Sequence, residues 1–298
     1  MSIIIHIGYP KTASTWFQDE YFPKIENYDY LVDRWLFYKL IFESDSLLYN
    51  PEFTRDQVKK NIGKKNSILS SEQLTTSLAF GWHSGNYSIA CAKKLKETYP
   101  GATIVIFIRR QQSLISSAYQ QYLKNGGTFG LKKYLYSGEV FDFNHLHFDR
   151  LIAYYDQLFG SDRVKVYLYE DFKEDNHTFL EKFNADLGIK VDLSKVSFIP
   201  VNKGLRVGFV PLLRLINYFH KKPIGKKRFV FHVPGVVSIA KKLIKHVNVL
   251  PLFGNYLNER SLLSPGDIEY IKKYYQESNN LLTNRLGVCD LERFGYFL

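Results

Sequence analysis

Apolar runs and helical repeats alternate over the first two thirds of the chain. Four short stretches predict strands, at residues 3–7, 64–71, 103–108 and 164–169, and the first of them is rich in β-branched residues. Apolar residues at helical spacing predict the helices that follow them, at residues 87–99, 114–122, 145–159 and 175–187. Strands that alternate with helices indicate an α/β fold, with a central parallel sheet flanked by helices.

The last third of the chain has a different pattern. Helical spacing recurs at residues 206–220, 235–246 and 264–286, and the last of these starts well, with Ser264 as cap and Pro265 at the first helical position. We therefore predict one domain, in which residues 1–192 form the α/β core. Residues 193–298 are predicted to form a mostly helical part that closes over the sheet as a lid.

Length and composition favour a single large domain with its own core. The chain has 298 residues, of which 45% are hydrophobic, and its two cysteines, Cys91 and Cys289, provide neither a disulfide framework nor a metal cluster. Such cysteine usage is typical of a reducing compartment.

The N-terminus lacks a basic leader, and no apolar run approaches the length of about 18 residues that a membrane span needs. The expected location is cytoplasmic, with peripheral membrane contact left open.

Positive charge is concentrated in one segment, residues 193–258. The chain has a net charge of +11, but this segment holds twelve Lys or Arg residues and no Asp or Glu. Outside it, 28 basic residues face 29 acidic ones. The basicity is thus a local property. We expect one cluster in it to steer an anionic partner, and the alternative is a solvated lysine-rich loop. The cluster comprises Lys221, Lys222, Lys226, Lys227 and Arg228.

Residues suited to chemistry follow the predicted strands where each one ends. Lys11 comes after the first strand, Glu72 after the second, Arg109 after the third, and Tyr169 lies near the end of the fourth. Ligands of parallel α/β sheets bind at the carboxyl ends of the strands. These four side chains are therefore predicted to share one site.

The turn after the first strand is built to bind an anion. Gly8 and Pro10 break the strand, and a helical pattern begins at Trp16. A strand, a tight polar turn and a helix aim free backbone N–H groups at an anion, and Lys11 adds a positive charge. A nucleotide triphosphatase loop places its lysine directly after a second glycine, whereas Lys11 comes three residues after Gly8 and directly follows Pro10. This order argues against an ordinary ATPase.

The string Gly-Tyr-Pro-Lys-Thr-Ala-Ser-Thr-Trp instead resembles the 5′-phosphosulfate loop of sulfotransferases that use 3′-phosphoadenosine 5′-phosphosulfate (PAPS). The usual loop of that family reads roughly Pro-Lys-[Ser/Thr]-Gly-[Ser/Thr]-[Ser/Thr], and Ala13 stands where glycine is common. The resemblance implies a P-loop-like sulfotransferase fold with PAPS as sulfuryl donor and no metal. It assigns eight loop residues to the donor: Gly8, Pro10, Lys11, Thr12, Ala13, Ser14, Thr15 and Trp16.

Three further stretches resemble donor-binding elements of the same family. Arg109 and Ser117, eight residues apart, resemble the element that binds the 3′-phosphate; Arg110 in the same register would meet Ala118. Tyr169, in Tyr-Glu-Asp, resembles the tyrosine that helps to bind adenine. The late loop that closes over the 3′-phosphate is matched by Lys203, Gly204 and Arg206.

Glu72 is the predicted general base. An acceptor hydroxyl that attacks sulfur must lose its proton, and a carboxylate aimed at that oxygen can accept it. Sulfotransferases that act on glycans often use glutamate here, so the resemblance points to a carbohydrate or lipid-linked glycan as acceptor. His83 is the rival base, whereas His6 lies within the first strand and is expected to be a core or sheet-edge residue.

Two other functions remain open from sequence. A nucleotide kinase or another phosphate-loop enzyme would need Mg²⁺, for which Glu170 and Asp171 are the available carboxylates. A non-enzymatic protein could bind an anionic polymer or a membrane through residues 193–258. That function would leave Lys11, Glu72 and Arg109 without a role. As a sulfotransferase, the protein is expected to bind no nucleic acid.

Overall fold

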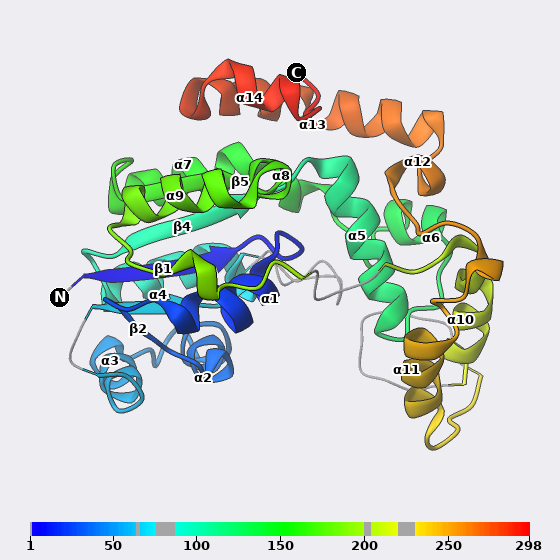
Figure 1. The fold of residues 1–298 in the computed structure, drawn as a ribbon, viewed down its shortest axis with the longest axis horizontal. Coiled ribbons are helices and arrows are strands. Elements are labelled where there is room, and N and C mark those ends of the chain that lie inside the picture. The colour runs from blue at the N-terminus through cyan, green and yellow to red at the C-terminus, as the bar shows by residue number, and fades with distance from the viewer. Residues whose placement is uncertain (1, 64–65, 76–86, 200–203, 220–229) are drawn as a thin grey trace.

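A central sheet of five parallel strands organises the molecule (Figure 1). The computed structural model describes residues 2–63, 66–75, 87–199, 204–219 and 230–298. The strand order is β2-β3-β1-β4-β5. The strands are β1 (Ile3–Gly8), β2 (Asp29–Tyr30), β3 (Ser67–Ser70), β4 (Thr103–Ile108) and β5 (Val164–Leu168). The predicted fold class is confirmed, and β2 is the strand that the sequence pattern did not predict.

The strand order creates a crevice between β1 and β4. β1 pairs with β3 on one side and with β4 on the other. The strands that follow β1 in the sequence are therefore added first on one side of β1 and then, from β4 onward, on its other side. Ligands of such sheets bind where the direction reverses, outside the carboxyl ends of the two strands. The segments that follow β1 and β4 begin at Tyr9 and Arg109. The topology therefore brings Lys11 and Arg109 together.

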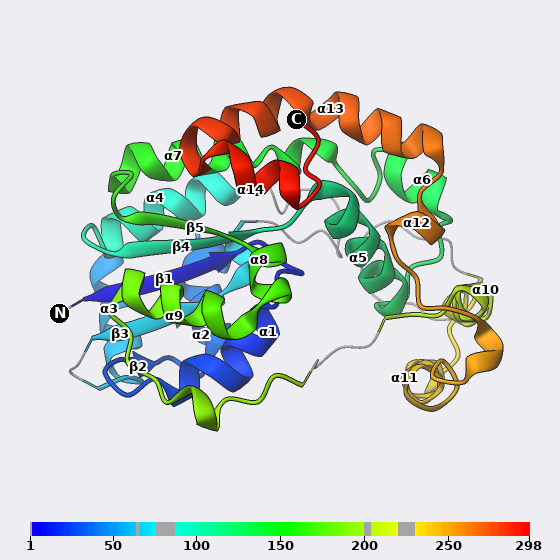
Figure 2. The ribbon, with the colours of Figure 1, turned by 45° about the horizontal axis from the view of Figure 1, so that its top comes forward.

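Alternate side chains of the central strands feed two separate cores. Ile5 and Ile7 of β1 face one core, and Ile4 faces the other. The first core lies under α3 (Pro51–Lys59), α4 (Ser88–Thr98) and α7 (Phe148–Phe159). The second lies under α1 (Ser14–Trp16), α8 (Tyr169–Glu174) and α9 (Asn176–Leu187). Figure 2 shows α9 and α1 in front of the sheet and α4 and α7 behind it.

His6 belongs to the second of these cores. It is fully buried on the central strand, where its Nδ1 lies 2.7 Å from Ser70 Oγ and its ring packs on Phe107. Burial lowers the pKa of His6 to about 3, so the imidazole is neutral. Its position is that of a core residue, and because β1 is the central strand the sheet-edge alternative is wrong.

The C-terminal third is mostly helical and packs around α5 (Gln111–Lys124). Its elements are α10 (Val210–Asn217), α11 (Val236–His246), α12 (Glu259–Leu262), α13 (Pro265–Leu286) and α14 (Val288–Arg293). α10 and α12 contact α5, while α13 contacts both α5 and α7. α10 and α11 lie side by side beyond α5, at the end of the molecule away from the sheet (Figures 1 and 2). The remaining α-helices of the described residues are α2 (Arg34–Tyr38) and α6 (Leu131–Tyr136), and short π-helical and 3₁₀-helical turns also occur.

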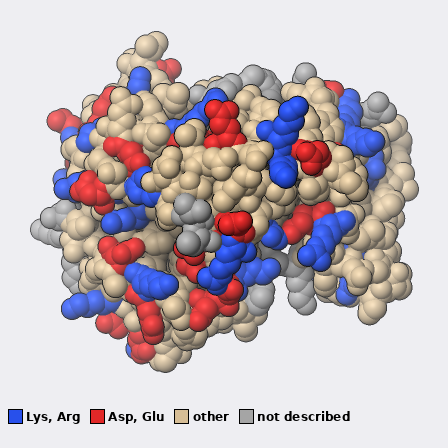
Figure 3. All heavy atoms as spheres, turned by 90° about the horizontal axis from the view of Figure 1, so that it is seen from above, with Lys and Arg blue, Asp and Glu red and all other residues tan. Residues whose placement is uncertain are grey.

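The surface of the body mixes both signs of charge. Figure 3 shows acidic and basic side chains interspersed over the face that carries α13 and α14. Among the described residues, no helix combines the length and the apolar character that crossing a bilayer requires. What distinguishes residues 193–258 from the rest of the chain is their charge, because they contain no Asp or Glu.

Candidate active site

A cavity of about 490 Å³ lies at the carboxyl ends of β1, β4 and β5. Its size falls in the range of small-molecule sites. Sixteen described residues line it, of which six are Lys or Arg and one, Glu259, is acidic. The basic ones are Lys11, Arg109, Arg110, Lys124, Lys173 and Arg260. A cavity with this charge suits a ligand that carries more than one phosphate or sulfate group.

The loop after β1 is wound tightly by its own side chains. The hydroxyls of Thr12 and Ser14 both donate to the carbonyl oxygen of Tyr9. Gly8 has φ +109°, and a Cβ there would lie 2.7 Å from the carbonyl oxygen of Glu72. These hydroxyls therefore shape the loop, and the backbone N–H groups are its means of holding an anion. Pro10 and Thr15 are half-buried.

Ala13 occupies the left-handed region, with φ +66°. An L-residue in this conformation costs about 1–2 kcal/mol, which glycine avoids. Here the loop geometry is kept with alanine, and α1 begins at the next residue, Ser14.

Lys11 extends from this loop into the cavity. Its Nζ donates to Gln121 Oε1 at 3.1 Å, and its own carbonyl accepts from Arg109 Nη1 at 3.0 Å. Burial lowers the pKa of Lys11 to about 8, the nearby charges of Lys124 and Arg109 add to the shift, and Glu72 opposes it. A nearby anion favours the ammonium over the neutral amine, so an anion bound in the cavity would raise this pKa.

Arg109 is fixed between the loop and two other elements. Its Nε and Nη2 donate to Ser113 Oγ at 2.9 and 2.6 Å, and its guanidinium carbon lies 4.5 Å from the centre of the Tyr169 ring. These bonds and the one to Lys11 use three of five N–H donors, which leaves two for a ligand. Ser117 lines the same cavity one turn beyond Ser113, but Arg109 bonds to Ser113.

One face of α5 supplies residues that the sequence analysis did not single out. Ser113, Gln120, Gln121 and Lys124 line the cavity together with Ser117. They recur every three to four residues, which is the spacing of neighbours on one helix face. The signal was therefore present in the sequence: extending the Arg109–Ser117 pair along the same helical stripe leads to Gln121 and Lys124.

Arg110 binds the C-terminal part instead of the cavity centre. Its guanidinium pairs with Glu259 and donates to the carbonyl of Phe294 at 3.2 Å. Its backbone N–H, at the start of α5, donates to Glu170 Oε1 at 3.1 Å. Tyr296 donates to the other oxygen of Glu170 at 3.2 Å. This carboxylate therefore ties α8, α5 and the C-terminal tail together.

Glu72 lies in a 3₁₀ turn, Glu72–Leu74, directly after β3 and beside Gly8. Its Oε2 accepts from Gln18 Nε2 at 2.8 Å, and the same amide nitrogen donates to Ser70 Oγ at 2.9 Å. The amide oxygen of Gln18 accepts from Arg34 at 2.6 Å. Gln18 thus orients the carboxylate. The sequence gives little indication of this role for Gln18, which is a single amide among aromatic residues.

The remaining predicted residues lie in several places. Gly204 lines the cavity, where a Cβ would approach Gln120 Oε1 to 3.1 Å. Trp16 is packed in the second core and donates from Nε1 to the Ser197 carbonyl at 2.7 Å. Arg206 lies outside the cavity lining and donates to backbone carbonyls. His83, Lys203 and the basic cluster at residues 221–228 lie outside the described residues.

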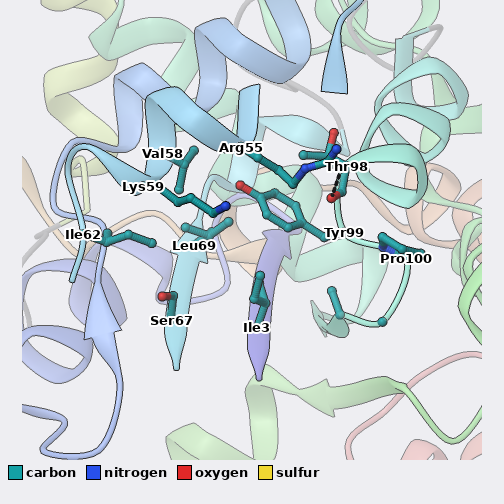
Figure 4. A pocket seen from close by; sticks show the side chains of 12 residues that line it. Ile3, Arg55, Val58, Lys59, Ile62, Ser67, Leu69, Thr98, Tyr99 and Pro100 are labelled. Carbon is teal, nitrogen blue, oxygen red and sulfur yellow. Dashed lines mark hydrogen bonds between the residues drawn. The ribbon is translucent and has the colours of Figure 1, made fainter. Parts of the chain in front are cut away.

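A second cavity, of about 250 Å³, lies at the opposite ends of the strands, the amino ends of β1 and β3 (Figure 4). Its lining is largely apolar and includes Ile3 and Leu69, and Arg55 at its side donates to the carbonyl of Thr98 at 3.0 Å. Because it is at the amino ends of β1 and β3, it is separated from Lys11 by the length of the sheet. It is not part of the candidate site.

Comparison with known proteins identifies the fold. The sequence matches no family model and no curated protein. A crystal structure of a sulfotransferase from Alicyclobacillus acidocaldarius superposes with a TM-score of 0.58 at 14% identity, covering 99% of this chain and 98% of that one. Mouse sulfotransferase SULT7A1 complexed with PAP gives 0.44 at 13% identity, covering 98% and 87%. The first likeness shows a shared fold over nearly the whole length, and the second is too distant to carry an argument.

Proposed function

We propose that the protein transfers a sulfuryl group from PAPS to an acceptor hydroxyl. The observation that carries this proposal is that four predicted residues line one cationic cavity: Lys11, Arg109, Ser117 and Tyr169. The cavity lies at the carboxyl ends of β1 and β4, where the order of strand addition reverses. These residues are spread over more than half the chain. Their types and order match the donor-binding elements that the sequence resembles.

The cavity offers a place for each part of the donor. Two N–H donors of Arg109 and the hydroxyl of Ser117 are available for the 3′-phosphate. The ring of Tyr169, already stacked with the Arg109 guanidinium, provides an apolar face for adenine. Lys11 and the loop N–H groups lie on the side of the 5′-phosphosulfate. The cationic lining compensates the several negative charges of such a molecule.

Transfer requires one S–O bond to form as another breaks. The acceptor oxygen attacks sulfur, the bond from sulfur to the bridging oxygen breaks, and the acceptor proton passes to the Glu72 carboxylate. Lys11 stabilises the charge that grows on the departing phosphate. Gln18 holds the Glu72 carboxylate through its 2.8 Å hydrogen bond, so that the base is oriented before the acceptor arrives.

The acceptor we propose is a hydroxyl of a carbohydrate or glycoconjugate, including a lipid-linked glycan. A glutamate at the end of the second predicted strand supports this class, because glycan-type sulfotransferases use that residue. Retention on immobilised adenosine 3′,5′-bisphosphate, with competition by free ligand, tests the donor site. Donor-dependent ³⁵S transfer to glycans, phenols and lipids tests the reaction. Transfer to phenols alone would leave the donor assignment intact and overturn the acceptor class.

We expect Arg109→Ala and Ser117→Ala to weaken binding of the 3′-phosphorylated nucleotide. Loss of a charge-assisted hydrogen bond costs about 1.5–3 kcal/mol, or roughly ten- to a hundred-fold in affinity. Adenosine 5′-phosphosulfate, which lacks the 3′-phosphate, should bind Ser117→Ala as well as wild type. Calorimetry with both ligands measures the difference. Equal losses for the two ligands in Ser117→Ala would contradict the assignment.

Donor affinity should fall as pH rises through about 8. The pKa of Lys11 is lowered to about 8 in the free protein, so its ammonium predominates below that pH and is lost above it. Because the donor prefers the charged lysine, binding must take up a proton above pH 8, and affinity should decline with a slope that approaches tenfold per pH unit. Calorimetry over this pH range measures it. Lys11→Arg, which stays charged, should remove the decline, and a wild-type affinity that is flat through pH 8 would contradict the contact.

A further inference from the structure

The chain just before residue 207 pairs with the chain just after residue 255, so the stretch between them starts and ends at one point, and α10 within it packs on α5. Arg206 and Tyr256 form an antiparallel bridge, Val207 N–H donates to the Asn255 carbonyl at 3.0 Å, and Leu257 N–H donates to Leu205 at 2.7 Å. The described parts of this stretch, residues 207–219 and 230–255, contain α10 and α11. We call them the α10–α11 lobe.

Arg206 fastens the base of the lobe. Its guanidinium donates to the carbonyls of Gly254 and Val249, and its central carbon lies 4.3 Å from the centre of the Tyr256 ring. Asn248 adds two bonds, accepting from the Arg206 N–H at 2.8 Å and donating to the Gly204 carbonyl at 3.0 Å. Gly204 and Leu257, on either side of this base, line the candidate donor cavity. The orientation of the lobe and the cavity mouth are therefore coupled.

The lobe exposes several aliphatic side chains. Eight of the twenty exposed large hydrophobic residues in the described chain belong to it, although it contributes only about a seventh of the described residues. On α10 and the turn before it, Val207, Leu212 and Leu215 are 44%, 37% and 58% exposed. The turn after α11 adds Leu250 and Leu252, at 41% and 75%. A Cβ on Gly208 would lie 3.1 Å from the Phe253 carbonyl, so the two turns are adjacent.

Cations accompany this apolar surface, and carboxylates do not. α11 directs Leu243 and Ile244 inward, where they pack against the core, and exposes Lys241, Lys242 and Lys245. Residues 193–258 contain no Asp or Glu. Exposed aliphatic residues combined with lysines fit the headgroup region of an anionic bilayer, where the apolar groups leave water and the ammonium groups meet lipid phosphates.

We propose that the α10–α11 lobe docks this protein onto anionic lipid bilayers. Leu212, Leu215 and Leu252 enter the boundary between headgroups and acyl chains, and the lysines of α11 contact the phosphates. Docking holds the base of the lobe, and with it the mouth of the cavity, at the membrane surface. This inference stands on the surface of the lobe and does not depend on the reaction proposed for the cavity.

Vesicle sedimentation tests the docking directly. Wild-type protein is mixed with vesicles of phosphatidylcholine and phosphatidylglycerol, or of phosphatidylcholine alone, at low and moderate salt. We expect binding to the anionic vesicles that weakens with salt and little binding to the neutral ones. Failure of the wild-type protein to bind the anionic vesicles at low salt would overturn the proposal.

Two variants separate the apolar from the ionic contribution. We expect the triple change Leu212→Ser, Leu215→Ser and Leu252→Ser to lower the vesicle partition coefficient by at least about tenfold. The triple change Lys241→Gln, Lys242→Gln and Lys245→Gln should lower it by about a hundredfold and weaken its salt dependence. All six side chains are exposed, so circular dichroism and thermal unfolding should stay close to wild type.

Matched controls use exposed residues outside the lobe. Leu47→Ser with Leu48→Ser removes two side chains that are 94% and 84% exposed, and Lys60→Gln with Lys272→Gln and Lys273→Gln removes three cations. Both controls should bind vesicles as wild type does. Equal losses in controls and lobe variants would overturn the proposal. So would a wild-type dimer that ignores vesicles and that the leucine variant dissociates, because a second copy would then cover this face.

Discussion

Replacing Lys11 by alanine should lower turnover by about two to three orders of magnitude. Loss of one preorganised group that stabilises transition-state charge typically costs about 2.7–4 kcal/mol. Lys11 is the only ammonium that the loop after β1 aims into the cavity among the described residues, and Arg109 and Gln121 hold it there through its carbonyl and its Nζ. Steady-state kinetics with saturating donor measures the effect.

A neighbouring lysine provides the matched control for this change. Lys173 lines the same cavity but extends from α8, and its side chain is exposed. Lys173→Ala should therefore weaken donor binding modestly, with a far smaller change in turnover. Near-normal turnover in a folded Lys11→Ala protein would contradict the role of this lysine and, with it, the proposed phosphosulfate site.

Local patterns predicted most of the fold because the forces that set them are local. The Ser264–Pro265 start predicted α13, and the structure has its capping box, in which Ser264 and Asp267 bond reciprocally, at that position. The four longer strands were predicted from their apolar runs. β2 was not, since it has only two residues, Asp29 and Tyr30, and exists through its pairing with β3.

The site was predictable where a strand end fixes a residue's position. Lys11 and Arg109 follow adjacent strands, so parallel topology alone brings them together. The bond from Arg109 to Ser113 was not predicted. The sequence paired Arg109 with Ser117 as joint ligands of one phosphate, and which hydroxyl the guanidinium bonds depends on the packed structure. In the structure it bonds to Ser113.

Contacts over long sequence distances were beyond prediction. The bonds of Arg206 to Val249 and Gly254 depend on where the chain comes back after residues 207–255. Helical spacing at residues 206–220 and 235–246 predicts helices there, but it does not predict where they pack. Gln18 is similar: it lies in the π-helical turn Phe17–Tyr21 after α1, and its amide meets Glu72, 54 residues further along the chain, only through the tertiary structure. Such residues become visible once the topology is known.

Glu72→Gln should abolish most turnover and leave donor affinity nearly unchanged. The amide has the size of the carboxylate, and its oxygen can still accept the hydrogen bond from Gln18 Nε2. It cannot accept a proton from the acceptor hydroxyl, and general-base catalysis typically contributes about 10²–10⁴-fold. Because the change removes an interaction made only during reaction, turnover should fall and donor binding should not.

A second variant distinguishes the base from the residue that orients it. Gln18→Leu removes the hydrogen bonds to Glu72 and Ser70 but keeps the carboxylate, so turnover should fall less than in Glu72→Gln and should retain its dependence on a titrating base. In Glu72→Gln that dependence should disappear from the pH profile. His83→Ala is the decisive comparison. If it loses turnover and the pH dependence while Glu72→Gln keeps both, the base is the histidine, and the glycan-type acceptor loses the residue that supports it.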